Sequence, residues 1–132
     1  MSASIARMIN ATPILRVNDL QASVAYYTGI LGFKLDWQTG GFGSVSRDRC
    51  TLFLCEGGQG HAGTWTWTGV SDVELLYTEL QGSGAKILQG PTNYPWGSRE
   101  MHVVDLDGHV LRFASEATDE PFGQFPSDRT DA

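Results

Sequence analysis

The sequence has few of the features that would bring a protein to a membrane, to nucleic acid or into an oxidising compartment. No apolar run approaches the roughly 20 residues that span a bilayer, and residues 1–10 have no apolar segment typical of a secretion signal. Lys and Arg number nine against 15 Asp and Glu, without a basic patch. We therefore expect neither a membrane nor nucleic acid as a partner.

Cysteine is also scarce, with only Cys50 and Cys55. The two residues lie five positions apart on an expected strand, so their side chains point to opposite faces and a disulfide between them is not expected. Free thiols without a secretion signal favour the cytoplasm.

The negative charge is concentrated at the C-terminal end. Residues 116–132 carry five acids and one base, which gives −4, whereas the ten acids and eight bases of residues 1–115 give −2. A chain of 132 residues suits one domain. We expect a single domain over residues 1–115, followed by an acidic tail over 116–132 that is mobile or lies across the surface.

The apolar pattern of the first half predicts a strand, a helix and three further strands. Asn18, with Gln21 three residues later, is typical of a capping box at a helix start, and Gly32 is placed to end that helix. Apolar residues recur at helical spacing between these two positions. The expected strands are residues 13–17, 33–37, 42–46 and 51–55.

The second half repeats this order. Ser71 and Glu74 form a second capping-box pattern, and Gly82 or Gly84 is placed to end the helix. The Asp-Gly pair at 107–108 is a strong turn signal between the last two strands. The expected strands are residues 65–68, 85–88, 101–104 and 109–113, with a loop over 89–97.

The two halves also match in sequence. TLFLC corresponds to VLRFA and NDLQ to SDVE, in a repeat of about 55 residues. This predicts an α+β fold made of two βαβββ modules, about 12–56 and 64–114, which together form a cup-shaped mixed sheet. The alternative is an unrelated α+β fold whose element order is coincidental.

Two stretches resemble a known family. ILRVNDLQASVAYYTGILGFKLDW is similar to the opening module of the glyoxalase / bleomycin resistance / extradiol dioxygenase (vicinal oxygen chelate) superfamily. PWGSREMHVVDLDGHVLRFAS is similar to its closing module, and its PWG-x-RE and D-x-x-G patterns resemble the bleomycin-resistance branch. The resemblance implies paired modules around a cup, usually in a homodimer, with ligand crevices at the dimer interface.

Enzymes of this superfamily hold a divalent metal with four side chains in the cup. The resemblance places these positions at Thr12, Leu54, Trp65 and Arg112. None is a good ligand for a divalent ion, and arginine is a permanent cation that would repel one. We therefore expect no metal, no cofactor and no catalytic residues, although a shift of one residue could bring Glu56 or His102 nearer.

Strands that would line a metal-free cup carry apolar and aromatic residues suited to a flat ligand. Loop aromatics are candidates for its rim, although Trp96 could instead pack its own turn against the core. Arg112 could bind a ligand carboxylate, stack on a ring, or be a structural residue paired with Glu100 or Asp105. The predicted ligand-binding residues are Thr12, Leu54, Trp65, Trp67, Met101, Val103 and Arg112 on strands, and Trp37, Phe42, Tyr94 and Trp96 in or beside loops.

We hypothesise metal-independent binding and sequestration of a small aromatic-containing molecule by a homodimer. A glycopeptide antibiotic of the bleomycin class is one candidate, which would make the protein an antibiotic-resistance factor. Against it, bleomycin is cationic and residues 1–115 are nearly neutral. The alternatives are a metal-dependent lyase or dioxygenase with an unusual ligand set, and an accessory module whose cup is filled by its own side chains.

Overall fold

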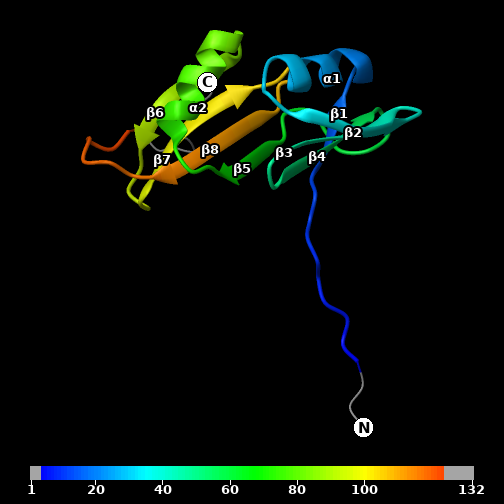
Figure 1. The fold of residues 1–132 in the computed structure, drawn as a ribbon, viewed down its shortest axis with the longest axis horizontal. Coiled ribbons are helices and arrows are strands. Elements are labelled where there is room, and N and C mark those ends of the chain that lie inside the picture. Colours follow the sequence, from blue (N-terminus) through cyan, green and yellow to red (C-terminus); the bar gives the residue numbers. More distant parts are fainter. Residues whose placement is uncertain (1–3, 124–132) are drawn as a thin grey trace.

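The computed structural model describes residues 4–123, which form two four-stranded sheets, each with one helix against it (Figure 1). The predicted α+β fold of two βαβββ modules is confirmed. The first module comprises β1 (Ile14–Val17), α1 (Leu20–Gly29), β2 (Lys34–Thr39), β3 (Phe42–Arg47) and β4 (Cys50–Glu56). The second comprises β5 (Trp65–Gly69), α2 (Val73–Ser83), β6 (Lys86–Asn93), β7 (Ser98–Val104) and β8 (Val110–Glu116).

Both sheets have the same topology. The strand orders are β1-β4-β3-β2 and β5-β8-β7-β6. In each module the first strand pairs in parallel with the last, and the other pairs are antiparallel. The repeated sequence pattern therefore corresponds to a repeated three-dimensional unit.

The helices begin one residue later than the capping patterns predicted. Asp19 caps α1 by accepting a hydrogen bond from the Ala22 backbone, and Asp72 caps α2 by accepting from Glu74 and Leu75. The assignment of Asn18 and Ser71 as caps was wrong, because a carboxylate directly before the first helical residue reaches these amides without a full capping box. Gly84, with φ of 87°, ends α2.

The segment predicted as a loop over 89–97 belongs largely to the sheet. β6 continues to Asn93, and β7 starts at Ser98 rather than at residue 101. The register between these strands shifts at Ile87/Gln89 and again at Gln89/Thr92. A strand is recognised in a sequence by the alternation of apolar and polar side chains. Each register shift interrupts this alternation, so residues 89–97 were predicted to be a loop.

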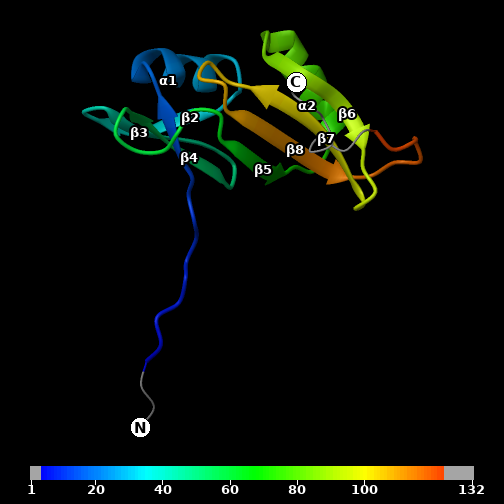
Figure 2. The same cartoon turned by 180° about the vertical axis from the view of Figure 1, so that it is seen from behind.

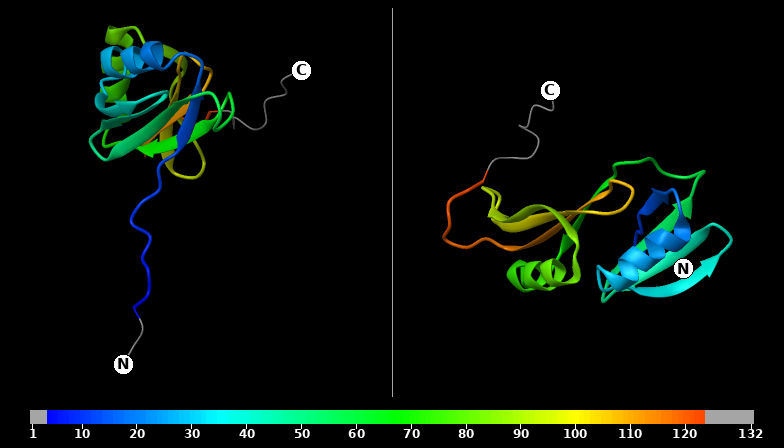
Figure 3. Two further views of the ribbon diagram at one scale, coloured as in Figure 1. Left: turned by 90° about the vertical axis from the view of Figure 1, so that its right-hand side faces the viewer. Right: turned by 90° about the horizontal axis from the view of Figure 1, so that it is seen from above.

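The core lies between each sheet and its helix. The two modules lie side by side with both helices on the same side of the sheets (Figures 2 and 3). None of the helices in residues 4–123 is long and apolar enough to cross a membrane. The buried apolar cluster includes Leu15, Leu20, Tyr27, Leu54, Val73, Leu80, Met101, Val103, Leu111 and Phe113.

The N-terminal end of the described chain leaves the globular body, whereas the C-terminal end is bound to it. Residues 4–13 run away from the sheets on the side opposite the helices (Figure 1), and Ile5, Met8 and Ile9 are at least 85% exposed. At the other end, Asn93 donates to Thr118 and Glu120, and Arg99 forms an ion pair with Glu120. Most of the predicted acidic tail, 124–132, lies outside the described residues.

Candidate functional site

The face of the second sheet that points away from α2 carries most of the polar and aromatic side chains of interest. Trp67 lies opposite Arg112 across β5 and β8, and Arg112 lies opposite His102 across β8 and β7. Side chains alternate along a strand, so Trp65 and Glu100 lie on this same face. We call this surface, built around Trp65, Trp67, Trp96, Glu100 and Arg112, the indole face.

Three residues predicted to line the cup lie on the other side of their sheets. Leu54, Met101 and Val103 are completely buried in the helix-side core. Their predicted orientation was wrong because the helices cover the strand faces that carry these aliphatic side chains. On β7 the indole face instead carries Glu100 and His102.

Phe53, rather than Leu54, is the first-module counterpart of Arg112. The sequence repeat already aligns the third residue of TLFLC with the third residue of VLRFA, and a shift of one residue moves a side chain to the opposite face. Phe53 packs with Trp37 and Phe42, at ring-centroid distances of 5.5 and 5.4 Å. These three rings form an aromatic cluster on the first sheet.

Glu100 is the centre of the indole face. It is completely buried and accepts hydrogen bonds from Trp96 Nε1 at 2.8 Å, from Trp67 Nε1 at 3.4 Å and from the Ser98 hydroxyl. Arg112 Nε donates to it at 2.8 Å, and Arg112 Nη2 forms an ion pair with it. Of the alternatives that the sequence left open for Arg112, the structure shows the ion pair with Glu100 and not the one with Asp105.

The hydrogen bonds keep Glu100 ionised despite its burial. Burial alone raises the pKa of this carboxyl, but the donors Ser98, Trp96, Arg112 and Trp67 outweigh it and hold the pKa below its ordinary value. The buried negative charge and the Arg112 guanidinium therefore compensate each other in place.

An aromatic stack adjoins this ion pair. Trp96 is parallel to Tyr94, with centroids 4.8 Å apart, and Tyr94 is nearly parallel to His102 at 6.5 Å. The rings of Trp65 and His102 form a T-shaped contact, with centroids 5.5 Å apart. Tyr94 is completely buried inside the stack, so its predicted place at the rim was wrong. Trp96 packs its turn and still keeps 46% of its surface exposed.

Exposed indole surface is what this face offers to a ligand. Trp65 is 48% and Trp67 60% exposed, whereas the Glu100 carboxylate on the same face already accepts several hydrogen bonds. Thr12 lies half-buried just before β1, and Trp37 and Phe42 belong to the aromatic cluster of the first sheet. The predicted ligand-binding residues are therefore distributed over the indole face, the aromatic cluster and the core.

The residues at the four metal positions do not fit a divalent ion. With Phe53 replacing Leu54, the set becomes Thr12, Phe53, Trp65 and Arg112, which supplies one hydroxyl, two aromatic rings and a cation. Within residues 4–123, no group of three or more His, Cys, Asp or Glu side chains is placed to hold a metal.

Comparisons with known proteins agree with this fold. Solved structures similar to the chain include TioX from Micromonospora sp. ML1, at 23% identity and a TM-score of 0.71, covering 83% of this chain and all of that one. A bleomycin resistance determinant encoded on the transposon Tn5 has 22% identity and a TM-score of 0.74, covering 84% of this chain and 100% of that one. The copper(II)-bleomycin complex of the bleomycin-binding protein from Streptomyces verticillus has 24% identity and a TM-score of 0.72, covering 86% and 100%.

At such identities the likeness establishes the fold alone, and no curated protein matches the chain in sequence. The family model of the Glyoxalase/Bleomycin resistance protein/Dioxygenase superfamily matches residues 7–113. Since this match spans most of the sequence, the protein belongs to the glyoxalase/bleomycin resistance protein/dioxygenase superfamily.

Proposed function

We propose that the protein binds and sequesters a small molecule with an aromatic part, without a metal ion, on the indole face. The observation that carries this proposal is the group of three half-exposed tryptophans, Trp65, Trp67 and Trp96, of which the last two donate hydrogen bonds to one buried carboxylate. Indole rings provide large apolar surfaces with little conformational freedom, which suits stacking on a planar ligand.

The ion pair of Glu100 and Arg112 supports a binding role without catalysis. Hydrogen bonds from two indoles to the same carboxylate fix the rings before a ligand arrives, so little side-chain entropy is lost on binding. The Arg112 guanidinium lies over the Trp96 ring, 5.9 Å from its centre, which adds a cation–π contact to the hydrogen bond that fixes this ring.

A glycopeptide antibiotic of the bleomycin class is the first ligand to test. Similar structures include a bleomycin-binding protein complexed with bleomycin, at 22% identity. We further propose a cytoplasmic homodimer that acts in antibiotic resistance, in which a second copy covers part of the exposed aromatic surface. The exposed apolar side chains of Ile5, Met8 and Ile9 favour such an association.

The test is a calorimetric titration of the full chain with metal-free bleomycin, repeated with Trp65→Ala. Leu106→Ala, which truncates an exposed apolar residue in the β7–β8 turn, is the matched control. We expect saturable binding at one site per chain that is weakened about 5- to 150-fold by Trp65→Ala, equivalent to about 1–3 kcal/mol, and unchanged by the control. A flat titration would exclude bleomycin as the ligand.

Two further measurements test the remaining parts of the proposal. Sedimentation equilibrium should give twice the chain mass if the homodimer forms. Bleomycin affinity should be the same after dialysis against a chelator, because no divalent ion takes part. Affinity that disappears on chelation and returns with a metal would instead support the metal-dependent alternative.

A further inference from the structure

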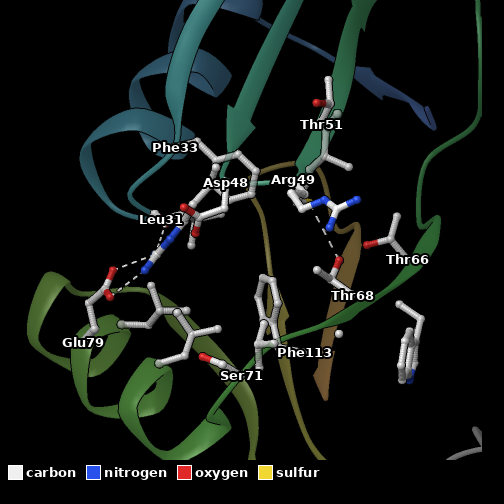
Figure 4. Close-up of a pocket in the computed structure, with 18 of the residues that line it drawn as sticks. Leu31, Phe33, Asp48, Arg49, Thr51, Thr66, Thr68, Ser71, Glu79 and Phe113 are labelled. Carbon is white, nitrogen blue, oxygen red and sulfur yellow. Dashed lines mark hydrogen bonds and ion pairs between the residues drawn. The ribbon is translucent and has the colours of Figure 1, made fainter. Parts of the chain in front are cut away.

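A recess lies between the two modules on the helix side of the sheets (Figure 4), and Trp67 is the one residue that it shares with the indole face. Its volume is about 800 Å³, which is within the range of small-molecule sites. It is lined by the β3–β4 turn, the end of α1, the β5 strand and one side of α2. We call it the inter-module groove.

One part of the inter-module groove is apolar. Leu31 and Phe33 from the first module face Leu75, Leu76 and Leu80 of α2 across it. Leu75 is 70% exposed although it lies beside this recess. Leu31, Phe33 and Leu80 are already buried, so the apolar surface that a chain of several methylene groups would remove from water is that of Leu75 and the half-buried Leu76.

The other part of the groove is polar and includes one cation. Figure 4 shows the Arg49 guanidinium directed toward the hydroxyls of Thr66 and Thr68. Thr66 Oγ1 is buried and has no hydrogen-bond partner among residues 4–123. The Thr68 hydroxyl contacts Cys50 Sγ at 3.8 Å, a weak interaction that leaves it able to donate elsewhere.

The other charged groups along the groove already have partners or face solvent. Arg47 donates to both carboxylate oxygens of Glu79, at 2.7 and 2.8 Å, and Asp72 caps α2. Asp48 is exposed at the tip of its turn. Arg49 forms no ion pair with any described residue, so its positive charge is the one available to a ligand in this groove.

We propose that the inter-module groove is a second binding site, for a small amphiphilic carboxylate. The carboxylate of the ligand accepts hydrogen bonds from Arg49 and from the hydroxyls of Thr66 and Thr68, and its hydrocarbon part lies against Leu75 and Leu76 of α2. An apolar wall selects an aliphatic body, and an unpaired guanidinium at one end selects a negative head group.

The test compares decanoate with 1-decanol by isothermal titration calorimetry, in the absence of bleomycin. We expect one decanoate per chain, bound roughly 3- to 10-fold more tightly than decanol, because Arg49 is solvent-exposed and its pairing is partly screened. Arg49→Gln should remove this difference. Arg7→Gln, which deletes the same charge from the N-terminal arm outside the groove, should preserve it.

Leu75→Gln provides the second variant, since it alters the apolar part at an exposed position that the fold does not need buried. It should weaken decanoate and decanol by the same factor. Melting curves of all three variants establish that each is folded. Equal affinity for decanoate and decanol in the wild type, or no saturable binding of decanoate, would overturn the proposal.

Discussion

Glu100 joins the indoles of Trp67 and Trp96 to the guanidinium of Arg112 through a single carboxylate. A buried charge is tolerated only when it is compensated locally, and here the compensation comes from five donor atoms on four residues. The geometry of the indole face therefore depends on one side chain whose removal leaves a partly buried cation.

Glu100→Gln should destabilise the protein by about 2–3 kcal/mol at pH 7, because Arg112 loses its ionic partner within the sheet. Urea unfolding of wild type and variant measures this difference. Glu116→Gln, at the exposed end of the same sheet, is the control and should change stability by less than about 0.5 kcal/mol.

The difference in stability between wild type and Glu100→Gln should be smaller at acid pH. The pKa of Glu100 is lowered in the fold by its hydrogen-bond donors, so its contribution is present above the unfolded value of about 4.3 and is lost as pH falls through the folded value. Repeating the urea unfolding below pH 4 should show a smaller difference. A difference that is constant with pH would mean that Glu100 is not ionised in the fold.

Trp65→Ala should cost only about 1 kcal/mol of folding stability, because nearly half of the ring is exposed and its ring contact is a T-shaped one with His102. Thermal or urea unfolding, measured beside the bleomycin titration, separates this small effect from the loss of binding. A stability loss of about 3–5 kcal/mol with unaltered affinity would instead identify Trp65 as a core residue.

At the level of strands and helices, element order could be predicted and side-chain orientation could not. Apolar spacing and turn residues give the order of the elements, but their ends are less exact: α1 ends at Gly29 rather than at Gly32, and each helix is capped by the Asp that follows the predicted cap. Alternation alone does not say which face of a strand the helix covers. On β4 both faces carry apolar residues, and on β7 the aliphatic Met101 lies on the helix side while Glu100 faces away from it. The bulged β6 strand was missed for a related reason, since its register shifts remove the alternation itself.

The start of α2 offers a direct comparison between sequence pattern and structure. Asp72 accepts hydrogen bonds from two backbone amides of the first turn, whereas Ser71 precedes it outside the helix. Asp72→Ala should therefore destabilise the protein by about 1 kcal/mol, and Ser71→Ala by much less. Thermal denaturation of the two variants measures this. If Ser71→Ala were the more destabilising of the two, Ser71 and not Asp72 would be the residue that caps α2.

For the whole molecule, the repeat predicted two modules but gave no indication of how they are joined. Polar contacts connect them at widely separated positions. His109 accepts from the Thr64 backbone at Nδ1 and lies 2.6 Å from the Arg16 carbonyl at Nε2, and Arg47 pairs with Glu79 on α2. Such long-range contacts depend on side chains that have no periodic signature in the sequence.

The most buried of these contacts joins Tyr27 of α1 to Asp105 before β8, where the hydroxyl donates to Oδ2 at 2.7 Å. Asp105 also accepts from the backbones of Asp107 and His109. Tyr27→Phe should destabilise the protein by about 1–2 kcal/mol at pH 8, because a buried carboxylate loses one of its donors. Tyr77→Phe, whose hydroxyl bonds to the exposed Gln81, is the control.

The effect of Tyr27→Phe should also depend on pH in the alkaline range. Burial first, and then the charge and hydrogen bond of Asp105, raise the pKa of Tyr27 well above its ordinary value. The stabilisation is therefore fully present below the unfolded pKa of about 10 and is lost as pH rises toward the folded value. Urea unfolding at pH 8 and pH 11 should show wild type losing its advantage over Tyr27→Phe at the higher pH. An advantage that persists unchanged at pH 11 would mean that this hydroxyl does not couple the two modules through Asp105.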